Sequence, residues 1–198
     1  LDTLTYKDVR QRTVNSLATR FNIDEEQAQA VSILAESIFD QVKKSWKLNR
    51  KSHLSLIIWA AELHEIGFDI NPSAYHKHGN YILANADLAG FNLEQQNALA
   101  YLVGNQRKKL KPAERNLWYV LKPSAIEKCA AILRLSVLLN QQRQLAIAPE
   151  FKVCTEKNAI TLLFEQSGFD EQGTIKDDLA NEITQLGNVG ITLEVTSG

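Results

Sequence analysis

The sequence contains no methionine at all and only two cysteines among its 198 residues. Because even an initiator methionine is missing, we expect a fragment of a longer protein or a processed chain. Cys129 and Cys154 stand alone in apolar surroundings, without the spacing of a zinc finger or a redox motif. We therefore expect two reduced core thiols and a cytoplasmic location, without disulfide or zinc chemistry.

Long apolar runs and a charge excess are also missing. No stretch reaches the length of a membrane span, and the first residues do not read as a signal peptide. Lysine and arginine number 22 against 23 acidic residues, so net charge draws the chain toward neither nucleic acid nor membrane. Glycine-rich phosphate loops of the GxxxxGK or GxGxxG type are absent, which excludes the common nucleotide cradles.

Apolar residues recur at helical spacing from residue 6 to about residue 144. Asp24 with Gln27 and Asn92 with Gln95 have the spacing of capping boxes, and Asn71 before Pro72 is typical of a helix start. A long helix is predicted over 124–143. The pattern predicts amphipathic helices that each bury one face.

The pattern changes after Pro149. "FKVCTEKNAITLLF" predicts two strands around a short turn, "TIKDDLANEITQLG" predicts a helix, and "VGITLEV" predicts a third strand. The sequence thus predicts a mainly α protein in two domains. Residues 1–146 form an all-helical domain, and residues 147–198 form a small α+β domain in the order strand, strand, helix, strand.

His64 and Glu65 lie together in the apolar stretch "AAELHEIGFDI". On a helix expected over 52–66, His64 would share a face with apolar residues and point into the domain, whereas Glu65 would turn away. Two interpretations remain open. The pair could belong to a metal-dependent hydrolase site, or His64 could be a core histidine that hydrogen-bonds a backbone carbonyl.

A basic run, "NQRKKLKPAER", occupies residues 105–115 and carries five basic side chains against one glutamate. Such a run contacts phosphates without reading any base, although a solvated loop is the alternative. The segment "YHKHGN" adds two histidines. The candidate phosphate ligands are His76, His78, Arg107, Lys108, Lys109, Lys111, Arg134 and Arg143.

Arg134 differs from the other candidates because it lies among apolar residues of the long helix. An arginine there is costly unless it meets an anion or a carboxylate. It could line a phosphate groove, or it could form a structural ion pair with Glu62 or Glu65.

Two segments resemble the C-terminal half of the exopolyphosphatase and guanosine pentaphosphate phosphohydrolase family. They are "WAAELHEIGFDINPSAYHKHGNYILANADLAGFNLEQQNALAYLV" and, later in the chain, "CAAILRLSVLLNQQRQ". The resemblance covers essentially the whole chain, including "RQRTVNSLATRFNID". It implies a helical domain like that of the HD metal-dependent phosphohydrolases, and then a small α+β domain.

The resemblance also implies a function. This half would bind inorganic polyphosphate and form a homodimer, while actin-like domains missing from this chain would carry catalysis with magnesium. No cofactor is expected in the chain itself. Nothing in it separates polyphosphate from guanosine pentaphosphate, and a nucleic-acid partner is disfavoured by the net charge and by the lack of aromatic residues within the basic run.

An HD phosphohydrolase would carry an early histidine, then a His-Asp pair, then a late aspartate. This chain has no histidine before His53, it has His64-Glu65 in place of the pair, and it has no aspartate between Asp87 and Asp170. We therefore expect no bound metal and no hydrolysis by this chain alone. A metal-dependent HD-type phosphohydrolase with an altered metal site is the alternative.

Overall fold

The structure is a computed structural model that describes residues 2–144, 151–164 and 173–197. The first part is helical and consists of α1 (Asp2–Arg20), α2 (Glu25–Trp46), a π-helical turn (Arg50–Leu54), α3 (Ser55–Glu62), α4 (Tyr75–Asn85), α5 (Leu93–Asn105), a short 3-10 turn (Arg115–Leu117) and α6 (Pro123–Gln144). The second part consists of β1 (Phe151–Glu156), β2 (Ala159–Phe164), α8 (Gly173–Gly187) and β3 (Thr192–Ser197).

The predicted mainly helical chain with a small sheet at its C-terminal end is confirmed. The likeness to HD domains and the domain boundary at 146/147 stay predictions.

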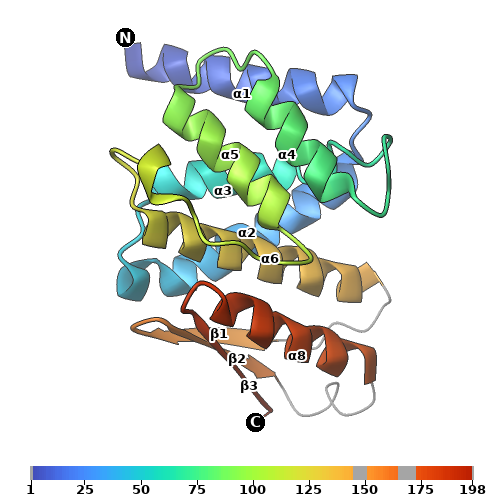
Figure 1. Cartoon of the computed structure of the whole chain (residues 1–198), viewed down its shortest axis with the longest axis vertical. Coiled ribbons are helices and arrows are strands. Elements are labelled where there is room, and N and C mark those ends of the chain that lie inside the picture. The colour runs from blue at the N-terminus through green and yellow to red at the C-terminus, as the bar shows by residue number, and fades with distance from the viewer. Residues whose placement is uncertain (1, 145–150, 165–172, 198) are drawn as a thin grey trace.

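Figure 1 shows α1 at one end of the molecule, the α4–α5 hairpin below it, and α6 running across the middle above the sheet. The central helices are held by burial of their apolar faces. In α2 the completely or almost completely buried residues include Val31, Ile38 and Val42, which follow helical spacing. On α6, Ile126, Cys129 and Leu133 are fully buried in the same cluster, as the periodicity predicts.

The sheet has the strand order β1-β2-β3. β1 and β2 form an antiparallel hairpin, whereas β3 runs parallel to β2 after the crossover through α8. Alternate residues of β2, namely Ile160, Leu162 and Phe164, are buried. Cys154 lies on the opposite, exposed face of β1, so the expectation of two core thiols is correct only for Cys129.

Local signals for helix ends are partly confirmed. Asp24 caps α2 by accepting a hydrogen bond from the backbone N–H of Gln27, and Asn92 with Gln95 forms a complete capping box at α5. The start predicted at Asn71 is wrong because α4 begins at Tyr75. The Asn71 side chain instead accepts hydrogen bonds from the backbone N–H and the hydroxyl of Ser73, which closes a local turn.

Candidate functional site

The basic run forms a loop that leaves the end of α5 and crosses in front of α6. Lys108 adopts a left-handed backbone conformation, with φ of +58°. Arg134 of α6 fixes this backbone shape, because its guanidinium donates to the carbonyl of Asn105 at 2.5 Å and to the carbonyl of Lys108 at 2.9 Å. Lys111 N–H donates to the Asn105 side chain at 2.9 Å. The loop is therefore tied to the core at several points.

Arg134 itself is only 2% exposed and does not reach the surface. Its Nε lies 2.5 Å from Oε1 of Glu182, which is also buried. The predicted alternative of a structural ion pair is confirmed, but the expected partners Glu62 and Glu65 were wrong, since the partner comes from α8. Arg134 supports the basic loop and does not line a groove.

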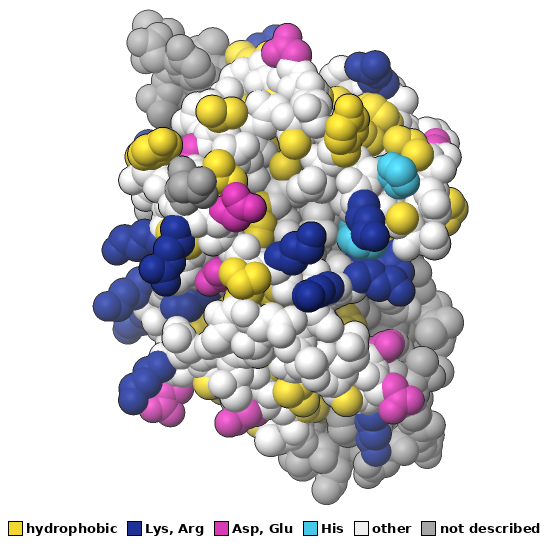
Figure 2. Space-filling model, in the orientation of Figure 1, with side chains coloured by type: hydrophobic (Ala, Val, Ile, Leu, Met, Phe, Trp, Pro, Cys, Tyr) yellow, Lys and Arg dark blue, Asp and Glu magenta, His cyan; other side chains and the backbone are white. Residues whose placement is uncertain are grey.

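A cavity of about 670 Å³ lies beside the basic loop. The basic loop, the end of α5, and α4 with the residues just before it form its walls. The lining residues are Ser73, Ala74, His76, Lys77, Asn80, Gly104, Asn105, Lys108, Lys109 and Lys111. Figure 2 shows lysine and arginine side chains gathered beside histidine across the middle of this face. The structure thus brings together His76, Lys108, Lys109 and Lys111 from the predicted set, and it adds Lys77. We call this the basic cavity.

The remaining predicted residues lie beside the basic cavity or outside the description. The guanidinium of Arg107 stacks over the ring of Tyr75 at 4.7 Å from its centroid, and it is 3.5 Å from the carbonyl of Pro72. His78 is half-buried and is not one of the lining residues. Arg143 belongs to the last turn of α6, but its side chain lies outside the described residues.

His76 has an unusual environment for a surface histidine. It is 5% exposed, and within the described part of the chain its Nδ1 has no hydrogen-bond partner. Burial, followed by the charges of Arg107, Lys77, Lys108 and Arg134, lowers the pKa of His76 to about 4. At neutral pH this imidazole is therefore neutral in the free protein and adds no positive charge to the basic cavity. An anion bound beside this imidazole would raise that pKa.

A second cavity of about 250 Å³ adjoins the basic cavity and shares Asn80, Asn105 and Lys111 with it. Its walls include the aromatic side chains of Tyr101 and Trp118, which meet edge to face at 6.4 Å between centroids. Asn97 contributes an amide. The indole Nε1 of Trp118 is buried and has no hydrogen-bond partner among the described residues. This aromatic cavity was not predicted, because its residues are scattered over four segments of the sequence.

The His64-Glu65 pair lies at the start of the segment that joins α3 to α4. α3 ends at Glu62, so the helix expected over 52–66 is too long and His64 occupies a turn. His64 is buried, and its Nδ1 donates to the carbonyl of Ala61 at 2.6 Å. The interpretation as a core histidine bound to a helix-end carbonyl is confirmed. Burial lowers the pKa of His64 to about 4, so the imidazole is neutral at neutral pH.

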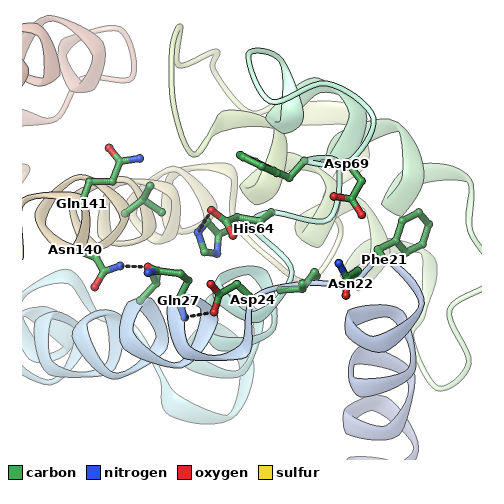
Figure 3. A pocket seen from close by; sticks show the side chains of 13 residues that line it. Phe21, Asn22, Asp24, Gln27, His64, Asp69, Asn140 and Gln141 are labelled. Carbon is green, nitrogen blue, oxygen red and sulfur yellow. Dashed lines mark hydrogen bonds and ion pairs between the residues drawn. The ribbon is translucent and has the colours of Figure 1, made fainter. Parts of the chain in front are cut away.

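Around His64 lies a pocket of about 420 Å³, drawn in Figure 3. The amide of Asn140 on α6 donates to Oε1 of Gln27 on α2 at 3.0 Å. His64 Nε2 is 3.9 Å from Oε1 of Glu65. In the described part of the chain no three His, Cys, Asp or Glu side chains are placed to hold a metal ion.

The structure defines a helical domain with a cationic cavity on a braced loop, and its described part holds no group of three side chains that could ligate a metal ion. Residues 9–183 match the family model of the Ppx/GppA phosphatases, domain III. The chain therefore belongs to the Ppx/GppA phosphatase family. Among the described residues, no helix is long and apolar enough to cross a bilayer.

Proposed function

We propose that this chain is the C-terminal, polyphosphate-binding and dimerising part of an exopolyphosphatase-like enzyme. It holds inorganic polyphosphate and presents it to a catalytic part outside this chain, where carboxylates and magnesium would remove the terminal phosphate. The basic cavity carries this proposal. The family match supports the class of ligand, because phosphatases of this family act on phosphate compounds.

Positive charge is concentrated on a fixed frame around the basic cavity. Lys77 from α4 converges on Lys108, Lys109 and Lys111 from the loop, while Arg134 holds the loop backbone. Four ammonium groups around one cavity repel each other unless an anion neutralises them. A phosphate chain does so and releases its own counterions, which makes such binding strongly salt-dependent.

The test titrates a polyphosphate of about a hundred units into the protein at two salt concentrations, because counterion release gives affinity a steep salt dependence. We expect the variant Lys77→Gln/Lys109→Gln/Lys111→Gln to lose affinity, and the slope of log affinity against log salt to fall by about one for each lost cation. The matched control is Lys44→Gln/Lys51→Gln/Lys152→Gln, which removes three exposed lysines that do not line the basic cavity. Equal affinity of both variants, or no effect of salt, would contradict the proposal.

The aromatic cavity favours a second ligand, a nucleoside polyphosphate such as a guanosine pentaphosphate. Its 250 Å³ and its aromatic and amide walls suit a purine ring, while the adjoining lysines would take the phosphates. Comparing inorganic tripolyphosphate with guanosine and adenosine triphosphates separates the two ligands. If neither nucleotide binds more tightly than tripolyphosphate, and Asn97→Ala has the same nucleotide affinity as the wild type, polyphosphate is the remaining candidate.

The alternative of an HD-type phosphohydrolase with an altered metal site has less support. No three described His, Cys, Asp or Glu side chains are placed to hold a metal ion, and the amides of Gln27 and Asn140 in the pocket around His64 are weak metal ligands. We expect the purified chain to hold substoichiometric transition metal and to have no phosphatase activity. Activity that manganese restores and His64→Ala abolishes would reverse this choice.

We also propose that the chain forms a homodimer in the cytoplasm. The family resemblance motivates the dimer, and several large apolar side chains of the helical part are exposed, including Ile33, Tyr81, Leu93, Tyr119 and Val120. Sedimentation over a range of protein concentrations tests it. A species of 22.3 kDa alone at high concentration would contradict it.

A further inference from the structure

The pocket around His64 is acidic, in contrast to the basic cavity. It lies between the end of α1, the start of α2, the turn after α3 and the last part of α6 (Figure 3). Asp24, Glu65 and Asp69 contribute carboxylates to its lining. None of the described lining residues is a lysine or an arginine. The guanidinium of Arg20 stacks on the ring of Phe21, a lining residue, at 5.5 Å from its centroid.

His64 points an unused acceptor at these carboxylates. Its Nδ1 carries the hydrogen that is donated to the Ala61 carbonyl, so Nε2 of the neutral ring carries a lone pair. Across 3.9 Å from Nε2 lies Oε1 of Glu65, which is also an acceptor. His64 is 4% exposed, and no described side chain donates to its Nε2. A donor placed between the buried acceptor of His64 and the partly exposed carboxylate of Glu65, whose side chain is 25% exposed, would satisfy both groups.

Other polar groups of the pocket also present acceptors. Asn140 uses its N–H to reach Gln27, which leaves the Asn140 carbonyl oxygen as an acceptor. Asp24 uses one carboxylate oxygen for the N–H of Gln27. Burial and then the negative charge of Asp24 raise the pKa of Glu65, so the two carboxylates repel each other. The pocket is therefore rich in negative charge and in acceptors.

We propose that this pocket binds a small organic cation through a primary ammonium group. Such a group is compact, carries three N–H donors and can bridge Nε2 of His64 to the Glu65 carboxylate while the Asp24 charge stabilises it. Phe21 and Phe68 also belong to the lining of the pocket. A structural metal ion fits less well, because the described residues contain no group of three ligating side chains. The site is separate from the basic cavity and does not depend on phosphate binding.

The pocket is connected to the basic loop through the backbone. Gln106, the first residue after α5, donates from Nε2 to the carbonyl of His64 at 2.5 Å. Thus the side chain of His64 presents an acceptor to the acidic pocket. Its backbone carbonyl binds Gln106, which begins the segment that leads into the basic cavity. The two sites use opposite sides of one residue.

The test uses 1,4-diaminobutane as the probe and butane-1,4-diol as the neutral probe of similar shape, in calorimetric titrations of the full chain. We expect the diamine to bind and the diol not to bind. Glu65→Gln and Asp24→Asn should each weaken the diamine by about tenfold or more, since each removes the charge from an ionic hydrogen bond. Asparagine still caps a helix, so Asp24→Asn preserves the start of α2. Asp87→Asn, at an exposed carboxylate outside the pocket, should change nothing.

A second readout follows the imidazole of His64 directly by ¹⁵N NMR. We expect the diamine to shift the Nε2 resonance while the Nδ1 hydrogen stays on Nδ1. Equal binding of diol and diamine, an unchanged Nε2 resonance, or full affinity in Glu65→Gln would overturn the proposal. Tight binding of Mn²⁺ that excludes the diamine would also overturn it, in favour of a metal site.

Discussion

At the scale of the residue, the buried pair of Arg134 and Glu182 has the largest predicted effect on stability. Glu182→Ala leaves a guanidinium uncompensated at a site that is 2% exposed, so we expect a loss of about 3–5 kcal/mol in the free energy of unfolding. The double variant Arg134→Met/Glu182→Leu should recover much of this loss, because it buries no charge. Urea unfolding measures both. Lys43→Gln, at a half-exposed ion pair with Asp40, is the control and should cost less than about 1 kcal/mol.

This pair also shows how far the sequence could lead. An arginine inside an apolar helical face predicted a buried anion or carboxylate partner, and such a partner exists. Its identity was not predictable, since Glu182 is 48 residues away on a helix of the second part. His76 shows the same limit. Its type and position suggested a phosphate ligand, but the burial that keeps it neutral depends on how α4 packs against the basic loop.

His64 makes stability depend on pH. Its pKa is 6.5 when unfolded and about 4 when folded, so below about pH 6.5 the unfolded chain binds a proton that the folded chain refuses. Stability is therefore complete above that pH and falls as the pH drops toward 4. Relative to His64→Gln, the wild type should lose about 2 kcal/mol more between about pH 7.5 and pH 5. Urea unfolding at both pH values tests this, and parallel losses in the two proteins would refute it.

At the scale of the element, the contact between the turn after α3 and α4 depends on Gly67. A Cβ at Gly67 would lie 2.4 Å from the carbonyl oxygen of Tyr75 and 2.8 Å from the N of Gly79, both backbone atoms that cannot move aside easily. We expect Gly67→Ala to cost about 2 kcal/mol or more. Gly187→Ala, at the end of α8, meets nothing within 4 Å and should be neutral or slightly stabilising. Thermal unfolding midpoints of the two variants test this contact. Equal midpoints for Gly67→Ala and Gly187→Ala would show that the backbone is not tightly packed at Gly67.

Helices were predicted best where the signal was local. The caps at Asp24 and Asn92 depend on a side chain and an N–H three residues apart, and both are present. The end of α3 was misplaced because the apolar pattern continues through His64 and Ile66 although the backbone turns after Glu62. Those residues are buried by the turn that packs Gly67 on α4, a tertiary contact that periodicity does not report.

At the scale of the whole molecule, the helical part and the small α/β part are joined by buried contacts. Their apolar residues form one continuous core cluster. Polar links cross between them as well, from the N–H of Val153 to Gln41 at 2.9 Å and from the N–H of Leu110 to Gln185 at 3.0 Å. The basic loop thus depends on α8 for part of its support. The sequence predicted two units but gave no measure of how strongly they are coupled.

We therefore expect the full chain to unfold in one cooperative transition. All three tryptophans, Trp46, Trp59 and Trp118, belong to the helical part, so their fluorescence follows that part alone. Amide hydrogen exchange of Leu162 in β2 follows the other part. The free energies from the two probes should agree in the wild type, and Glu182→Ala should lower both together because it removes the ion that α8 supplies to Arg134. If β2 exchanges through an opening that leaves the fluorescence unchanged, or if Glu182→Ala affects only one probe, the two parts are independent units and the basic loop does not need α8 to keep its shape.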